Sequence, residues 1–295
     1  MTDRIEILTL RSRLFRSIRN FFFEHGFIEV ETPVKIAAPA PEEHIESVRA
    51  EGEFLRTSPE LAMKGLLSEG FQRIFQIGSC FRAGEHGSRH REEFTMLEFY
   101  AVGMGYRELA RFTAEFIARA ARELFGTTFL EYRKQRLDLT ECEFPTVREA
   151  FLRYGGLRME EAEKRDCFDE VMVTKIEPEL GRGHLTFLCD YPAERASLAR
   201  LRADDSSVAE RWELYLAGIE LANAFGELTD AAEQRARFRA AREFRARAGM
   251  HPYPEPLEFY AALERGLPQS SGCAMGLDRL CMIFADAPEI GGVRA

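Results

Sequence analysis

The sequence predicts an α+β fold in which a mostly antiparallel sheet is flanked by helices. Residues 71–101 and 213–228 each consist of two β-type stretches joined by a turn or loop, which is the pattern of an antiparallel hairpin. Helical periodicity precedes, separates and follows these two hairpins. No linker rich in Pro, Gly or Ser interrupts the chain, so we expect a single domain over residues 1–295.

Charge and composition argue against several classes of protein. The chain has 40 Lys and Arg against 49 Asp and Glu, and its net charge of −9 does not supply the basic surface that binds a nucleic-acid backbone. Its 6 cysteines form no CxxC pair, which indicates free thiols in a reduced, cytoplasmic chain. No apolar run approaches about 18 residues, and Asp3, Arg4 and Glu6 oppose a signal peptide, so we expect no membrane association.

Helical patterns account for much of the chain. Residues 4–25 place Leu14, Ile18 and Phe22 at helical spacing, and Gly26 follows as a cap. The least informative stretch is 137–170, where short helical patterns alternate with glycine and charged breaks. The remaining expected elements are short strands over 27–31 and 184–190, a loop over 37–47, and helices over 106–125, 231–248, 257–264 and from 277 onward.

A helix is expected to begin after residue 58. Thr57 or Ser58 can cap it, Pro59 suits its first position, and Glu60 lies in its first turn. A carboxylate in that place complements the positive end of the helix dipole. From the pattern alone, this structural role is sufficient to explain Glu60.

The hairpin at residues 71–101 has a strongly charged connection. Its first arm ends at Arg82, on the polar face of the strand, and the loop over 83–92 is rich in Arg, His and Glu. Charges at a hairpin tip are usually solvated. An arginine at the root of a polar, Gly-containing loop also suits phosphate binding, so both interpretations stay open.

The second arm of this hairpin, residues 93–101, has a carboxylate among apolar side chains. Alternation places Phe94, Met96, Glu98 and Tyr100 on one face. Burial of an unpaired carboxylate is costly unless a cation or hydrogen-bond donors accompany it. Glu98 is therefore a candidate binding group.

The second hairpin brings two more carboxylates together. A turn at residues 217–218 places Glu213 and Glu220 within one or two residues of register. Close carboxylates repel each other, so one takes up a proton or a divalent cation such as Mg²⁺ lies between them. Glu227 follows Glu220 by seven residues, so both can line one pocket only if a bulge or turn lies within 223–226.

Two C-terminal stretches complete the pattern. The helix over 231–248 is strongly basic, and a solvated face explains it better than the docking of an acidic partner. At residues 271–276, Gly272, Ala274 and Gly276 leave room for the close approach of a ligand, and Arg279 falls in the first turn of the following helix.

Together, these motifs resemble the class II aminoacyl-tRNA synthetases of the lysyl branch. In chain order the matching stretches are VETP at 30–33, RTSPELAMKGLL at 56–67, FRAGEHGSRHREEFTMLEFY at 81–100, AERWELYLAGIELANAFGELTDAAEQRARF at 209–238 and SGCAMGLDRLCM at 271–282. The fourth stretch, with FLRYGG at 151–156 and YPAERASLAR at 191–200, is more similar to the short paralogues that ligate (R)-β-lysine to elongation factor P.

The resemblance implies a function. We expect an ATP-dependent, AMP-forming ligase that uses Mg²⁺, activates (R)-β-lysine or lysine as an adenylate and transfers it to a lysine side chain of elongation factor P. Two alternatives remain: a lysine-specific paralogue with another acceptor, and a catalytically silent paralogue that binds an amino acid and regulates a partner. The resemblance also implies a homodimer that pairs through the segment at 27–33.

The resemblance assigns roles to individual residues. Arg82 and Arg279 are the catalytic residues, and Glu213 and Glu220 are the metal ligands. The amino-acid substrate contacts Ser58, Pro59, Glu60, Glu98, Tyr100, Asn223, Glu227 and Ala274. ATP contacts Arg82, Ala83, Gly84, Arg91, Phe94, Glu220, Leu221, Gly276 and Arg279.

Departures from the family pattern also matter. Family members have Phe-Arg-x-Glu where this chain has an extra residue before Glu85, and Arg91-Glu92 stands where Asn-Pro is usual. Ala274 replaces the usual glycine of the synthetases, a change that the resemblance links to (R)-β-lysine. The chain begins at the catalytic helix, so we expect no anticodon-binding domain and no stable binding of tRNA.

Overall fold

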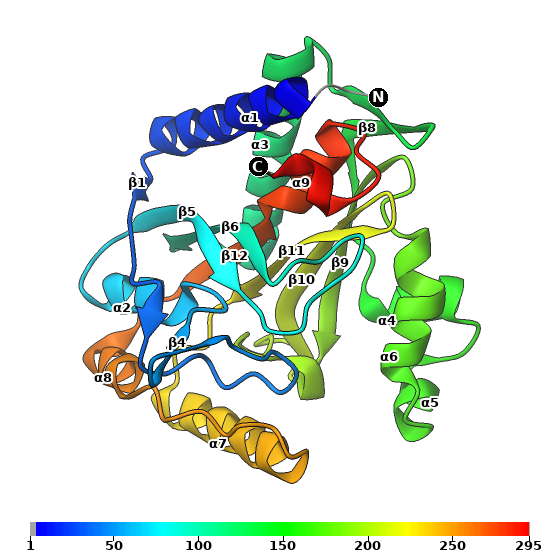
Figure 1. Cartoon of the computed structure of the whole chain (residues 1–295). Helices are drawn as coiled ribbons and strands as arrows, with labels where there is room; N and C mark the ends of the chain where they lie inside the picture. Colours follow the sequence, from blue (N-terminus) through cyan, green and yellow to red (C-terminus); the bar gives the residue numbers. More distant parts are fainter. Residues whose placement is uncertain (1–3, 295) are drawn as a thin grey trace.

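The computed structural model describes residues 4–294; Asp3, expected near the start of the first helix, and Ala295 lie outside the described residues. In the described part of the chain, nine strands form one mostly antiparallel sheet in the order β1-β5-β6-β12-β11-β10-β9-β8-β7 (Figure 1). This confirms the expected α+β class. The strands of this sheet are β1 (Ile28–Glu29), β5 (Arg73–Phe81), β6 (Glu93–Val102), β7 (Phe129–Tyr132), β8 (Gln135–Glu143), β9 (His184–Pro192), β10 (Val208–Leu216), β11 (Ile219–Gly226) and β12 (Ser270–Gly276).

Helices cover the sheet and its ends (Figure 1). The largest core lies between one face of the sheet and α1, α3 and α9. A second core joins α2, α7 and α8, and a third fills the helical region of α4, α5 and α6. The helices are α1 (Arg4–Glu24), α2 (Glu60–Ser68), α3 (Tyr106–Phe125), α4 (Val147–Ala150), α5 (Met159–Lys164), α6 (Phe168–Val171), α7 (Ala231–Arg247), α8 (Leu257–Gly266) and α9 (Leu277–Phe284).

Most of the expected elements are present. The hairpin of β5 and β6 pairs residue 73 with 101 through to 81 with 93, so Gln76 lies opposite Glu98 and Cys80 opposite Phe94. Helix α3 ends at Gly126, which has a φ of +73°. The expected loop over 37–47 has no helix or strand.

Several strands were missed. Strands β7 and β8 are amphipathic and short of β-branched residues, so their sequences do not signal a sheet edge. A small sheet, with β2 (Lys35–Ile36), β3 (Arg49–Ala50) and β4 (Glu53–Leu55) in the order β2-β4-β3, was also missed, because strands of two or three residues give no periodicity.

A bulge reorients the second hairpin. The pairing of β10 with β11 shifts between Leu214 and Tyr215, so that Leu221 is the extra residue of β11. Glu220 and Asn223 therefore lie on the same face of the sheet, and the following odd-numbered residues keep that face. The expected bulge exists, but its location within 223–226 was wrong.

The basic helix α7 is largely neutralised by the chain itself. Arg235, Arg237 and Arg242 form ion pairs with carboxylates of the same chain, and Arg245 is buried against Glu46. Such pairing supports a scaffold role for the helix more than a docking surface.

The thiols and the lengths of the helices can be stated directly from the structure. All six cysteines, at positions 80, 142, 167, 189, 273 and 281, are free. Within residues 4–294, every helix is too short or too polar to cross a bilayer.

Candidate active site

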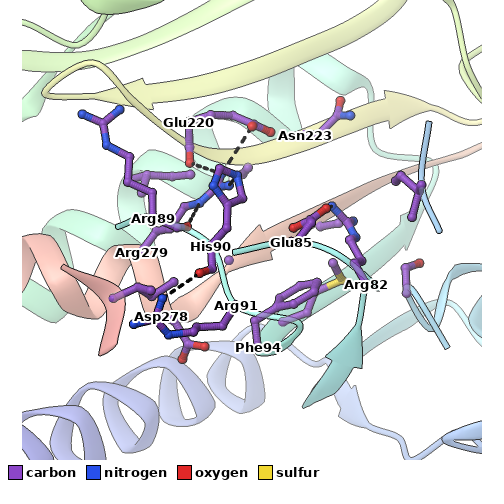
Figure 2. A pocket seen from close by; sticks show the side chains of 18 of the residues that line it. Arg82, Glu85, Arg89, His90, Arg91, Phe94, Glu220, Asn223, Asp278 and Arg279 are labelled. Carbon is purple, nitrogen blue, oxygen red and sulfur yellow. Dashed lines mark hydrogen bonds and ion pairs between the residues drawn. The ribbon is translucent and has the colours of Figure 1, made fainter. Parts of the chain in front are cut away.

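A cavity of about 240 Å³ lies on the face of the sheet opposite α1 and α3. Its walls come from β6, β11 and β12, from the loop that joins β5 to β6, and from the start of α9 (Figure 2). Alternate residues of the strands point to this face, while their neighbours in the sequence fill the core. The cavity brings together eleven of the residues assigned from the sequence: Ser58, Glu60, Arg82, Arg91, Phe94, Glu220, Leu221, Asn223, Ala274, Gly276 and Arg279.

The first catalytic candidate, Arg82, directly follows β5. Its guanidinium carbon lies 5.1 Å from the centre of the Phe94 ring, and its Nε is buried without a hydrogen-bond partner in the described residues. Glu85 lies 3.7 Å from Arg82, so the acid that is displaced in the sequence still reaches the arginine. An arginine with an unsatisfied donor beside an aromatic ring can hold an anionic group attached to a planar base.

The second catalytic candidate, Arg279, lies in the first turn of α9 and is held by four groups, of which one is the Arg89 carbonyl that accepts from its Nε at 3.2 Å. It donates to the backbone oxygen of Glu220 at 2.8 Å, lies 3.3 Å from the carboxylate of that residue, and approaches His90 Nε2 at 2.7 Å (Figure 2). Burial, with the charge of Arg279 next, lowers the pKa of His90, which favours the neutral imidazole that can accept this hydrogen bond.

The loop between β5 and β6 closes on itself. Gly84, with a φ of +78°, donates its N–H to the Glu92 carboxylate at 2.8 Å, and the Ala83 N–H donates to the Glu46 carbonyl. Arg91 lines the cavity but donates to the Gly87 carbonyl at 2.6 Å. Ala83 and Gly84 do not line the cavity, although both were assigned to ATP binding.

The two carboxylates assigned to a metal differ in their surroundings. Glu213 does not line the cavity and accepts hydrogen bonds from Arg211 at 2.5 Å, Tyr191 at 2.6 Å and Tyr215 at 2.7 Å. Glu220 lines the cavity, and burial together with the charge of Glu213 raises its pKa. This is the repulsion expected for two close carboxylates.

A third carboxylate in this region has no signal in the sequence. Glu177 lies in a 3₁₀ turn that precedes β9. Burial and the charges of Glu213 and Glu220 raise its pKa to about 7. Nothing in the spacing around residue 177 pairs it with a hairpin more than thirty residues later, so pattern analysis could not find it.

A buried acidic cluster adjoins the cavity. Glu98, Tyr100 and Glu227 do not line the cavity and are almost completely buried. The Tyr100 hydroxyl donates to Glu98 at 2.5 Å, and Lys64 Nζ lies 2.5 Å from Glu60 and 2.6 Å from Glu227. Glu60 lines the cavity and therefore connects it to this cluster.

The residues at the start of α2 and in β12 hold these side chains in place. Pro59 precedes the first residue of α2, and Ser58 Oγ accepts the Glu60 N–H at 3.0 Å. Ala274 lies opposite Glu98 in the pairing of β12 with β6. Gly272 was expected to make room for a ligand, but the space in front of it is filled by Tyr100 and Glu227.

Sequence reasoning missed several side chains of the site. Lys64 was assigned only to the helix; its spacing allows the i,i+4 pair with Glu60, but its second partner, Glu227, could not be inferred from spacing. Glu42 lines the cavity from an irregular loop, and burial raises its pKa to about 7 against the opposing charge of Arg82. Asp278 also lines the cavity; it accepts the Thr95 N–H at 2.9 Å and lies 2.6 Å from Arg11.

Comparison with known proteins places this geometry in a family. The family model for tRNA synthetases class II (D, K and N) matches residues 2–295. An elongation factor P--(R)-beta-lysine ligase of Mannheimia succiniciproducens is 38% identical over 99% of this chain and 94% of its own length. A similarly named ligase of Vibrio cholerae is 35% identical over 100% of this chain and 96% of its own length.

Full-length synthetases match as well. A lysine--tRNA ligase of Chromohalobacter salexigens is 35% identical over 97% of this chain, which spans 62% of that enzyme's length. The family match covers nearly every residue, and the structure has the antiparallel sheet and the arginine-lined cavity that the motifs predict. The chain therefore belongs to the class II tRNA synthetase family of the aspartate, lysine and asparagine group.

Proposed function

We propose that the protein activates a diamino acid, (R)-β-lysine or lysine, with ATP and transfers it to a lysine side chain of elongation factor P. One observation supports this most directly: Arg82, Arg279 and Glu60 line a single cavity. The Glu60 carboxylate also contacts Lys64, and so connects the cavity to the buried acidic cluster. Such an arrangement suits a triphosphate and a doubly cationic amino acid together. The relatives named elongation factor P--(R)-beta-lysine ligase support the choice of acceptor.

Activation requires positioning and charge compensation. In our proposal, Phe94 stacks on adenine, Arg82 binds the α-phosphate and the substrate carboxylate, and Arg279 binds the γ-phosphate and covers the other face of adenine. Arg91, Leu221 and Gly276 line the same cavity. The carboxylate oxygen forms a bond to the α-phosphorus and pyrophosphate leaves, so no protein nucleophile is needed.

The donor set near Glu220 fits a magnesium ion bound together with the nucleotide. Residues 4–294 contain no group of three or more His, Cys, Asp or Glu side chains that could hold a metal ion. In our proposal, phosphate oxygens complete the coordination. Burial, with the charge of Glu213 next, raises the pKa of Glu220, and Glu213 is its expected partner in binding the metal. Bound Mg²⁺ would neutralise charge on the phosphates.

Amino-acid recognition is assigned to the acidic side of the cavity. Glu60 is proposed to bind one ammonium group of the substrate, and Glu98, Tyr100 and Glu227 the other. Ser58, Pro59, Asn223 and Ala274 complete this site. The Ala274 methyl group, where the synthetases usually have hydrogen, favours (R)-β-lysine over lysine. In the second step the acceptor amine attacks the acyl carbon, and AMP leaves.

Other activities make different predictions. Similarity to lysine--tRNA ligases, at 35% identity, favours tRNA as a second candidate acceptor, although the net charge of −9 offers no general attraction to a phosphate backbone. A silent amino-acid sensor would have no use for Arg82, Arg279 and the carboxylate pair at 213 and 220.

We also propose a cytosolic homodimer. Phe23, Ile28 and Val34 are exposed, and Ile28 belongs to the edge strand β1, in the segment that pairs subunits in the family. Exposed apolar side chains beside an edge strand favour association with a second copy. Free thiols at all six cysteines fit a reducing compartment.

Pyrophosphate exchange tests the activation step. Incorporation of labelled pyrophosphate into ATP is measured with (R)-β-lysine, lysine and norleucine, which lacks the second ammonium group. We expect exchange with the two diamino acids, fastest with (R)-β-lysine, and none with norleucine. Exchange with norleucine, or no exchange with any of the three, would refute the proposal.

A further inference from the structure

Lys64 is a buried lysine held between two carboxylates. It lies on α2, one turn after Glu60, and its side chain is 0% exposed. Its Nζ lies 2.5 Å from Glu60 Oε1 and 2.6 Å from Glu227 Oε2. Lysine is almost never fully buried without such partners. A single ammonium therefore links α2 to the residue that follows β11.

Some carboxylate oxygens near Lys64 have no hydrogen-bond partner among the described residues. In the described residues, Glu227 Oε1 and Glu98 Oε2 are buried with no hydrogen-bond donor. Glu98 Oε1 accepts the Tyr100 hydroxyl at 2.5 Å. Lys64 thus pairs with two of the three carboxylates, and the oxygens left without a donor can be satisfied by protons or by a cationic ligand.

The charges around Lys64 define its effect on this cluster. Burial would lower the Lys64 pKa, but Glu227 and Glu60 more than offset it, and the pKa lies above its usual value. Burial raises the pKa of Glu227 to about 7 and that of Glu98 to about 8, and in both cases the charge of Lys64 opposes the rise. Lys64 also opposes the rise at Glu42, and Arg200 has the same effect on Glu227.

We propose that Lys64 is a positioning residue of the amino-acid site. It holds Glu60 and Glu227 in place, so that their other oxygens can bind the two ammonium groups of a diamino acid. This inference rests on the proposed function and adds a residue that the family motifs did not assign. Without Lys64, Glu60 and Glu227 would lose the contact that fixes their positions, and no lysine charge would oppose the raised pKa of Glu227.

The Lys64→Met variant tests this inference in the pyrophosphate-exchange assay. We expect the KM for (R)-β-lysine or lysine to rise at least about tenfold, while the KM for ATP changes less than about twofold. The acid limb of the amino-acid KM profile should move to higher pH, because Glu227 loses the cation that lowers its pKa. Lys35→Met is the matched control, since Lys35 is an exposed lysine paired with Glu53.

The outcomes separate the two proposals. An unchanged amino-acid KM and pH profile in a folded Lys64→Met protein would overturn the role of Lys64 alone. A wild-type protein without exchange would overturn the proposed function and this inference with it. If Lys64→Met fails to fold, Lys64→Met/Glu227→Gln removes one charge of each sign. The KM of this double variant for the amino acid should be less than tenfold higher than that of Glu227→Gln. A tenfold or larger difference would contradict the inference.

Discussion

Gly272 shows how closely the side chains of the site are packed. A Cβ at this position would lie 2.2 Å from the Tyr100 ring and 2.6 Å from Glu227 Oε1. Both neighbours are buried and tied to the acidic cluster, so neither can move without disturbing it. A hydrogen atom is therefore the only side chain that fits at this point of β12.

Gly272→Ala is expected to destabilise the protein. Overpacking of this kind costs about 1–3 kcal/mol in the free energy of unfolding. Gly65→Ala is the control, because Gly65 lies within α2 and a Cβ there would meet nothing within 4 Å. This variant should be more stable than the wild type by up to about 1 kcal/mol, because alanine has the better helix propensity. Urea unfolding measures both. Equal stabilities of Gly272→Ala and wild type would contradict this account of the packing.

The raised pKa of Glu98 predicts how stability depends on pH. Its folded pKa of about 8 lies above the unfolded value of 4.5, so the folded chain holds a proton that the unfolded chain releases. The contribution is fully present below the unfolded pKa and is lost as pH rises through the folded pKa. Glu227, with a folded pKa of about 7, changes stability in the same direction.

Glu98→Gln is expected to reduce this pH dependence. Glutamine stays neutral, so the decline in unfolding free energy between about pH 5 and pH 8 should become shallower than in the wild type. Glu108→Gln, at an exposed position of α3, should leave the slope unchanged. Urea titrations at several pH values measure the slopes. A Glu98→Gln slope as steep as that of the wild type would show that Glu98 is already charged in the folded state.

At the scale of elements, α1 supports the start of α9. Arg11 of α1 lies 2.6 Å from Asp278, donates to Thr95 at 2.8 Å, and thereby connects α1, α9 and β6. Arg294 approaches the other oxygen of Asp278 at 3.5 Å. Asp278 precedes Arg279 in the chain, so these contacts hold the first turn of α9 against the floor of the cavity.

Arg11→Met is expected to weaken this junction. Removal of one partner of a buried ion pair costs about 3–5 kcal/mol in the free energy of unfolding. Because Asp278 keeps its contact with Arg294, we expect a loss of about 3 kcal/mol or less. The KM for ATP should also rise, because Arg279 follows Asp278. Arg16→Met, at an exposed position of the same helix, should change stability by less than about 0.5 kcal/mol. Thermal unfolding and exchange kinetics measure the two effects, and equal behaviour of both variants would contradict them.

At the scale of the whole molecule, local patterns predicted much of the fold. Period-two alternation predicted the hairpin of β5 and β6 and the facing of Glu98, and helical spacing with a glycine cap predicted α1 and α3. The bulge was expected within residues 223–226 but lies at Leu221, because its position depends on the pairing of β11 with β10. Strands β2, β3 and β4 were too short to give a pattern.

Local sequence patterns also predicted part of the candidate site. Arg82 follows β5, Phe94 lies at the start of β6 and Arg279 lies in the first turn of α9, so motifs locate them, and the structure places them around one cavity. Glu177 and the pairing of Lys64 with Glu227 were missed because these partners lie far apart in the sequence, and no local spacing records such contacts. Composition could suggest charge, but only the folded chain shows which charges share a site.

One measurement tests the central claim most directly. The protein is incubated with ATP, Mg²⁺, (R)-β-lysine and elongation factor P, with lysine tRNA in a parallel reaction, and the mass of elongation factor P is determined. We predict that elongation factor P gains the mass of one β-lysyl residue on a lysine side chain, in an ATP-dependent reaction, while the tRNA stays uncharged. Unmodified elongation factor P, with or without charging of the tRNA, would contradict the account.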